Sequence, residues 1–122
     1  MDSPLSFSVL PGEFTIVRLA PDDPPPPHWF SLTRTADELS VVCLAAHTPP
    51  DARAEPGWRM LKLHGPFPFH LTGILASVLN PLADARIPIF ALSTFDTDYV
   101  LVKAPDLDRA RDALLTAGHR FA

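Results

Sequence analysis

Cysteine is almost missing from this sequence of 122 residues, with Cys43 the only one. An intrachain disulfide is therefore impossible, which fits a reducing compartment, and we expect a cytoplasmic protein. The N-terminus carries Asp2 and no basic segment ahead of an apolar one, so it does not resemble a secretory signal. The longest unbroken apolar runs, such as 41–46, are far shorter than the roughly 20 residues of a membrane span. We therefore expect no membrane partner.

A cluster of positive charge is also missing. Ten basic residues are scattered along the chain against fourteen acidic ones, and the formal net charge is −4. Binding to a phosphate backbone requires basic residues gathered on one surface or segment. We therefore expect no nucleic-acid partner.

Motifs of enzyme chemistry are equally scarce. The five histidines show no metal-ligand spacing, although His64 and His70 flank one loop and leave a site there open. Cys43 lies in an apolar segment typical of a core strand, and Ser93 lacks the Gly-x-Ser-x-Gly context of a hydrolase. The loop 65–69 is apolar and carries no arginine, unlike the cationic phosphate loop of acylphosphatase-like enzymes. We expect a non-catalytic protein with no metal and no cofactor.

Proline, in contrast, is abundant, with 15 residues in the chain. It fixes φ and removes a backbone donor, so runs of it interrupt regular structure. The runs 24–27 and 49–50 therefore mark connectors. Between them, alternating or apolar segments predict four strands, at 6–10, 13–19, 29–33 and 39–44, and a loop at 49–57.

The second half of the sequence has a clearer periodicity. Apolar residues recur at the spacing of one helix face, namely Leu71, Ile74, Leu75, Val78, Leu79 and Leu82. Strand-like segments lie at 59–64, 87–93 and 99–103. A second helix begins near Pro105 and ends at Gly118, before a short edge strand at 119–122. The order β-α-β-β-α-β predicts an α+β, ferredoxin-like fold with two helices on one face of an antiparallel sheet.

The two halves carry related hairpins. The segment 29–33 matches 89–93 in chemical pattern at an offset of 60, and both continue through an acidic turn into a second strand. The alternative, that any two hairpins look alike, stays open at this point. Because the first half lacks an obvious first helix, we predict a degenerate copy at 1–58 and a complete unit at 59–122.

The segments 71–75 and 87–102, LTGIL and IPIFALSTFDTDYVLV, resemble an ACT domain. More narrowly, they are similar to small bacterial tandem-ACT proteins related to the regulatory domains of aspartate kinase. The Ser-Thr-aromatic-x-x-Asp turn at 93–98 also resembles the ligand-binding ACT repeats of CASTOR-type arginine sensors. The resemblance covers 59–119 well, and the first half only through the hairpin at 33–42.

The resemblance implies a regulatory protein that binds an amino acid at an interface between ACT units. Matched by position, Gly73 would let the start of the first helix approach the ligand carboxylate. Thr94 and Phe95 would line the pocket, and Asp98 would hold the α-ammonium group. Ser40 and Val41, on a strand of the first half, would form the opposite wall of the pocket. Because the first half is shortened, its contribution to the pocket is in doubt.

The chemistry of a zwitterion agrees with this assignment. A helix N-terminus offers N–H groups and the positive end of a dipole, glycine permits close approach, and a carboxylate on the hairpin supplies the opposite pole. Both residues also have a purely structural explanation, because aspartate is common in turns and Gly73 would allow a close helix–sheet contact. The alternative is a structural or protein-interaction module with a degenerate pocket. Exposed edges of two small sheets predict a homodimer in either case.

Overall fold

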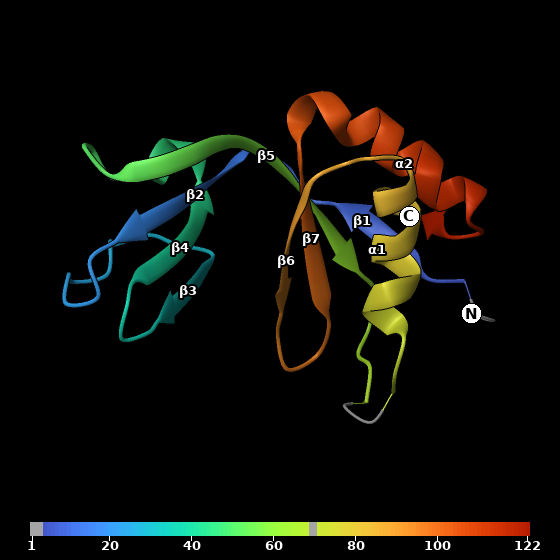
Figure 1. Cartoon of the computed structure of the whole chain (residues 1–122), viewed down its shortest axis with the longest axis horizontal. Coiled ribbons are helices and arrows are strands. Elements are labelled where there is room, and N and C mark those ends of the chain that lie inside the picture. The colour runs from blue at the N-terminus through green and yellow to red at the C-terminus, as the bar shows by residue number, and fades with distance from the viewer. Residues whose placement is uncertain (1–3, 69–70) are drawn as a thin grey trace. The chain divides into compact units, whose positions relative to one another are not determined.

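The computed structural model describes residues 4–68 and 71–122, which fold as two compact units. Gly12–Trp58 forms one, here called the β unit, and the chain up to Pro11 combines with Arg59–Ala122 in the other, the helical unit. The strands, in chain order, are β1 Ser6–Val9, β2 Phe14–Leu19, β3 Ser31–Arg34, β4 Leu39–Leu44, β5 Arg53–Leu63, β6 Ile89–Ser93, β7 Asp98–Lys103 and β8 Arg120–Phe121. Figure 1 labels β1 to β7. The helices are α1 Ile74–Asp84 and α2 Leu107–Thr116, with 3-10 turns η1 Ala45–His47 and η2 Ala104–Asp106.

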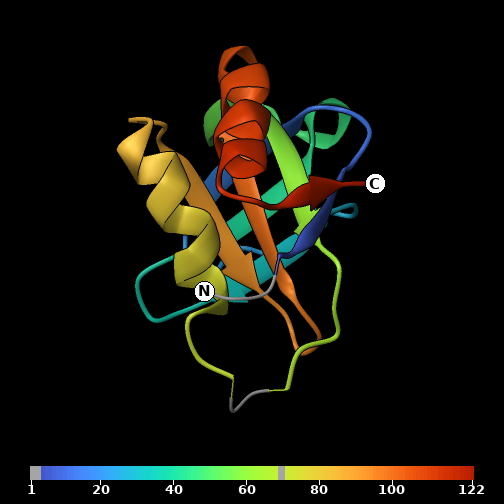
Figure 2. The ribbon, with the colours of Figure 1, turned by 90° about the vertical axis from the view of Figure 1, so that its right-hand side faces the viewer.

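The sheet of the helical unit has the strand order β8-β1-β5-β7-β6. β1 runs antiparallel to β5, with Phe7 opposite Leu63, and parallel to β8, with Phe7 opposite Phe121. β6 and β7 form an antiparallel hairpin that ends at the pair Ser93 and Asp98. Both helices lie on one face of this sheet (Figure 2). The β-α-β-β-α-β order and the ferredoxin-like fold are thereby confirmed.

The core of the helical unit fills the space between this sheet face and the two helices. Alternate residues of β5 and β7 point into it, and each helix contributes two fully buried side chains. Its buried members are Leu5, Phe7, Leu61, Leu63, Val78, Leu82, Ile87, Val100, Val102, Ala110 and Leu114. No helix in the described part of the chain is long and apolar enough to cross a membrane.

The position of β1 differs from the expectation that residues 1–58 form one half. β1 belongs to the helical unit, where it separates β5 from β8. It does not pair with β2 across the Pro11-Gly12 turn, although the two strands are neighbours in sequence. Phe7 is fully buried in the helical core and stacks on Phe121, 5.4 Å between ring centres. A short apolar strand does not reveal its partner, because pairing is decided by which face it can bury.

The first helix begins three residues later than its apolar stripe indicates. Gly73 precedes α1 with a left-handed φ of 78°, and Leu71 stays 45% exposed outside the helix. Val78 and Leu82 are fully buried, whereas Leu75 packs against the core only in part. The apolar stripe is therefore confirmed, and its fully buried residues lie in the middle and C-terminal turns of α1.

Pro81 lies inside α1, yet the helix continues to Asp84. A proline at this position cannot donate a hydrogen bond to the carbonyl four residues earlier, which is that of Ser77. His119 takes the place of the missing donor, with Nε2 at 2.9 Å from the Ser77 oxygen. Its Nδ1 accepts a hydrogen bond from the Leu5 N–H at 3.1 Å, so Nε2 carries the ring proton. One buried imidazole thus joins β1, α1 and the start of β8.

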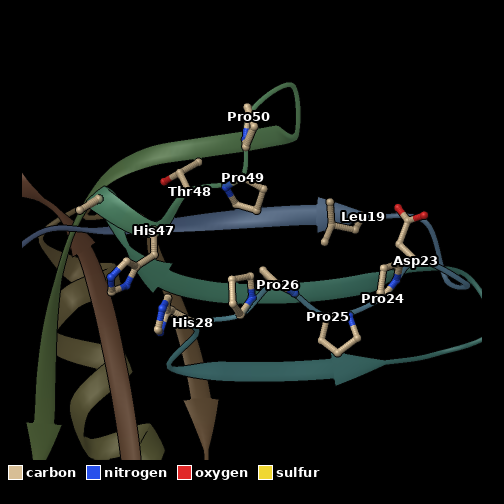
Figure 3. Close-up of a pocket in the computed structure, with 12 residues that line it drawn as sticks. Leu19, Asp23, Pro24, Pro25, Pro26, His28, His47, Thr48, Pro49 and Pro50 are labelled. Carbon is tan, nitrogen blue, oxygen red and sulfur yellow. The ribbon is translucent and has the colours of Figure 1, made fainter.

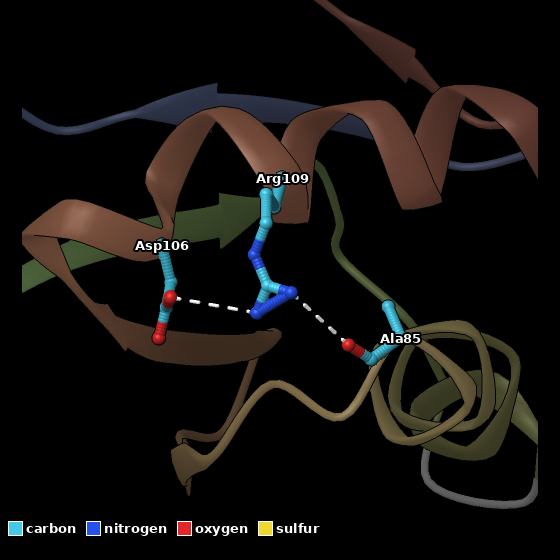
Figure 4. Close-up of polar contacts among 3 residues, drawn as sticks. All are labelled: Ala85, Asp106 and Arg109. Carbon is cyan, nitrogen blue, oxygen red and sulfur yellow. Dashed lines mark hydrogen bonds and ion pairs between the residues drawn. The ribbon is translucent and has the colours of Figure 1, made fainter.

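Arg109 connects the two helices at their surface (Figure 4). Its guanidinium donates to the Ala85 carbonyl, 3.3 Å away at the end of α1, and pairs with Asp106 at 3.5 Å. A cation at a helix C-terminus is favourable because the last carbonyls are unpaired and carry partial negative charge.

The β unit has the strand order β3-β4-β2-β5. β2 and β4 pair antiparallel along their whole length, from Phe14 opposite Leu44 to Leu19 opposite Leu39. One cluster of its core joins the buried side chains Val17, Leu39, Val41 and Cys43. The expected absence of a first helix from this half is confirmed by its described elements, which are strands and the 3-10 turn η1.

The loop expected at 49–57 is wrong in its second part, because β5 already begins at Arg53. Arg53, Ala54 and Glu55 pair with β2, and the register shifts before Trp58 reaches Phe14. This bulge holds Pro56 and Gly57, the latter at a φ of 85°. Proline and glycine are tolerated in a strand at such bulges, so composition alone marks the segment as a loop.

Candidate functional site

The hairpin between β6 and β7 is held by its two threonines. Thr94 accepts the Thr97 N–H at 3.3 Å on its Oγ1, and its own N–H donates to the Thr97 carbonyl at 2.8 Å. The Thr97 hydroxyl is buried and donates to the Leu63 carbonyl of β5 at 2.8 Å. The four-residue turn is therefore fixed both internally and to the central strand.

Asp98 is the first residue of β7, directly opposite Ser93. The Ser93 hydroxyl donates to one of its carboxylate oxygens, Oδ1. Phe95 lies at the tip of the turn and is 78% exposed. The hairpin thus presents an oriented carboxylate beside a large exposed ring.

The loop before α1 packs on the same hairpin. The Phe67 N–H donates to the Asp96 carbonyl at 2.8 Å. A Cβ at Gly65 would stand 2.9 Å from that same oxygen, so this close approach requires glycine. Loop, hairpin and helix start together enclose a cavity of about 180 Å³, lined by Phe67, Pro68, Leu71, Ile74, Ser93, Thr94, Phe95, Asp96, Thr97 and Asp98.

The N-terminus of α1 reaches this cavity through Ile74. No side chain of the described residues caps the helix, and the Ser77 N–H donates to the Gly73 carbonyl at 3.0 Å. The N–H groups of the first turn have no partner within a helix, which makes such an end suited to an anion. A Cβ at Gly73 would meet nothing within 4 Å. The chain therefore needs glycine there for its positive φ, and not for a close helix–sheet contact.

The cavity has both polar and apolar lining residues. Asp96 and Asp98 contribute carboxylates, and no lysine or arginine of the described residues lines it. Its apolar lining includes Phe67, Pro68 and Leu71 from the loop before α1. Such a lining favours a small molecule that carries both a cationic group and apolar atoms. The sequence did not single out these apolar loop residues, because nothing local indicates that the loop folds over the hairpin.

Of the six positions expected to bind a ligand, Thr94, Phe95 and Asp98 line this cavity, and Gly73 immediately precedes the lining residue Ile74. Ser40 and Val41 lie on β4 of the β unit. The Val41 side chain is fully buried in that unit's core, and Ser40 is half-buried. Their assignment to an opposite wall stays a prediction.

The hairpin of β3 and β4 repeats the threonine-closed turn. The Thr35 N–H donates to the Glu38 carbonyl at 2.9 Å, and its Oγ1 accepts the Glu38 N–H at 3.1 Å. Thr35 matches Thr94 at an offset of 59, one residue less than the 60 expected from the sequence. At this offset Leu39, which is fully buried, stands where the other hairpin has Asp98. The first hairpin therefore has the turn without the carboxylate.

Neither a reactive thiol nor a cluster of three metal ligands occurs among the described residues. Burial raises the pKa of the Cys43 thiol, opposed by a hydrogen bond with Thr48, so the thiol stays protonated at neutral pH and is a poor nucleophile. No group of three or more potential metal ligands occurs in the described part of the chain. His70, one of the pair left open by the sequence, lies outside the described residues.

Comparisons with known proteins identify relatives for both parts of the chain. The model of the ACT domain family matches residues 53–116, and a model of an N-terminal domain matches 12–51. A crystal structure of an Agobacterium tumefaciens protein is 42% identical, with a TM-score of 0.91, covering 98% of this chain and 93% of that one. Aspartate kinase of Clostridium acetobutylicum shares the fold at 12% identity and a TM-score of 0.68, over 86% of this chain and 33% of the kinase.

Among curated proteins, the human cytosolic arginine sensor for mTORC1 subunit 1 is 32% identical over 98 residues. The match covers 80% of this chain but only 24% of the sensor, so the chain spans about a quarter of that relative. The family model covers more than half of the chain and includes both helices and the β6–β7 hairpin. On this evidence, the chain belongs to the ACT domain family.

Proposed function

We propose that this protein is a non-catalytic regulatory module that binds an amino acid in the cavity between the α1 N-terminus and the β6–β7 hairpin. The proposal rests on one observation: a helix N-terminus, which suits an anion, and a carboxylate, which suits a cation, border the same small cavity. Ile74 brings the open N–H groups of the first helical turn to it, and Asp98 brings an oriented carboxylate. A zwitterion needs both.

In this arrangement the ligand carboxylate lies at the helix start, where the N–H groups and the helix dipole stabilise a negative charge. The α-ammonium group lies at the second carboxylate oxygen of Asp98, since Ser93 holds the first. The ligand side chain then runs along Phe67 and Leu71. A volume of about 180 Å³ is below the roughly 300–1,000 Å³ of sites for drug-sized ligands, which suits a metabolite of amino-acid size.

The names of the relatives give the order in which ligands are tested. The human relative is an arginine sensor, and the aspartate kinase structures belong to enzymes that act on another amino acid. A thermal-shift screen of the full chain against the common amino acids, beginning with arginine, tests the proposal. A ligand that binds only the native state stabilises it by about 2.7 kcal/mol at 100 times its Kd. A rise in Tm confirmed by calorimetry is the expected result.

A second function, a protein-interaction module without a ligand, is favoured by one observation. The Ser93 hydroxyl already donates a hydrogen bond to the Asp98 carboxylate, so this carboxylate has a partner within the protein even without a ligand. If no amino acid at millimolar concentration changes the Tm or produces heat in calorimetry, the amino-acid site is refuted and the interaction module remains.

A further inference from the structure

A second cavity, of about 600 Å³, lies wholly within the β unit (Figure 3). Half of its twelve lining residues are prolines, from the runs 24–27 and 49–50. Arg34 holds one wall in place by donating to the carbonyls of Pro21 and Asp23. The two proline runs, which the sequence marks only as connectors, thus form the walls of one cavity.

Two histidines lie side by side at one end of this cavity (Figure 3). His28 follows the first proline run and His47 ends η1, and their ring centres are 4.7 Å apart. With metal–nitrogen distances of about 2.1 Å and the ring centre about 1.1 Å beyond the nitrogen, two imidazoles bound side by side on one ion have ring centres about 4.5–5.2 Å apart. The observed spacing falls in this range.

The residues that line the cavity offer few hydrogen-bond donors. Proline has no N–H, so six of the lining residues contribute only carbonyl oxygens from the backbone. No lysine or arginine from the part of the chain that the structure describes lines the cavity, and the Thr48 hydroxyl already donates to the Ala45 carbonyl at 2.8 Å. Within the described residues, neither imidazole has a hydrogen-bond partner. Such surroundings suit a cation rather than an anion.

We propose that His28 and His47 form a two-histidine site for a divalent transition-metal ion of the zinc, nickel or copper type. Neutral imidazole is a favoured ligand of these ions. Asp23 lies at the far end of the cavity (Figure 3), so the open cavity leaves the remaining coordination positions to water. The site belongs to the β unit and is independent of the amino-acid cavity of the helical unit.

Calorimetric titration of the tag-free, metal-free full chain with zinc chloride, and separately with nickel chloride, tests this site. We expect one ion per chain, and His28→Gln and His47→Gln should each weaken binding by at least about tenfold, because a chelate needs both nitrogens. His64→Gln is the matched control, since His64 is an exposed histidine of the helical unit whose nearest partner is the Ser8 hydroxyl. Its affinity should equal that of the wild type.

The exposed positions of both histidines predict unchanged Tm values for the metal-free variants, which separates loss of the site from loss of the fold. Copper bound to the wild type should also show two equivalent nitrogen ligands in its electron paramagnetic resonance spectrum. The proposal is overturned by absence of binding to the wild type, by loss on changing only one of the two histidines, or by an equal loss in His64→Gln.

Discussion

At the scale of single residues, Asp98 is the side chain on which the amino-acid site depends. Asp98→Asn should weaken ligand binding by about 1.5–3 kcal/mol, because a charge-assisted hydrogen bond to the ammonium group becomes a neutral one. Folding should hardly change, since the asparagine oxygen still accepts from Ser93. Calorimetry with the ligand found in the screen measures the difference.

Asp96→Asn is the control, because Asp96 lines the same cavity but is exposed in the turn, where solvent screens its charge. Its effect should be much smaller. Equal affinities of the wild type and Asp98→Asn would remove the site assignment and leave the fold untouched.

The pairing of His119 with Ser77 leads to a second prediction at this scale. His119→Leu leaves the Leu5 N–H and the Ser77 carbonyl without their partner in a buried region, which should cost about 2–4 kcal/mol of unfolding free energy. In a Pro81→Ala background, the new N–H at position 81 can reach the Ser77 carbonyl. The same histidine substitution should then cost about 1 kcal/mol less.

Urea unfolding of the four proteins of this double-mutant cycle measures the coupling. A loss of equal size in both backgrounds would show that His119 does not substitute for the helix bond that Pro81 removes.

At the scale of elements, the residues of the apolar stripe of α1 should contribute unequally to the free energy of unfolding. Leu82 is fully buried, so Leu82→Ala should destabilise the protein by about 2–5 kcal/mol. Leu75 occupies the same stripe but is only partly buried, and Leu75→Ala should cost roughly 1–2 kcal/mol. Chemical denaturation separates the two, and the reverse order would mean that the N-terminal turn of α1 carries more of the core than its burial indicates.

The two hairpins make a related point about elements. Their turns share the same threonine hydrogen bonds, which supports the proposal that the β unit is a degenerate copy. The offset of 59 rather than 60 could not be obtained from chemical similarity, because the continuous apolar runs 41–43 of β4 and 100–102 of β7 match nearly as well one residue apart. Hydrogen bonding in the turn selects the register, and only that register shows that Leu39 replaces Asp98.

At the scale of the whole molecule, sheet edges remain open in the described structure. In the helical unit β6 pairs only with β7 and β8 only with β1, and in the β unit β3 pairs only with β4. Exposed edges tend to be covered by another chain, so we propose a homodimer. Light scattering should give twice the monomer mass of 13.4 kDa. A monomer at high micromolar concentration would contradict this.

Local sequence alone determined the helices, the β6–β7 hairpin and the ferredoxin-like order, because helical periodicity, proline and glycine act within a few residues. The choice of Thr94, Phe95 and Asp98 rests on the resemblance of their turn to ACT domains, because an aspartate in a turn otherwise has an ordinary explanation. Tertiary structure decided the partner of β1, the extension of β5 and the meeting of His28 with His47. It also placed His119 at the carbonyl freed by Pro81. Each of these depends on segments far apart in the chain, and their pairing follows from which surfaces can be buried together.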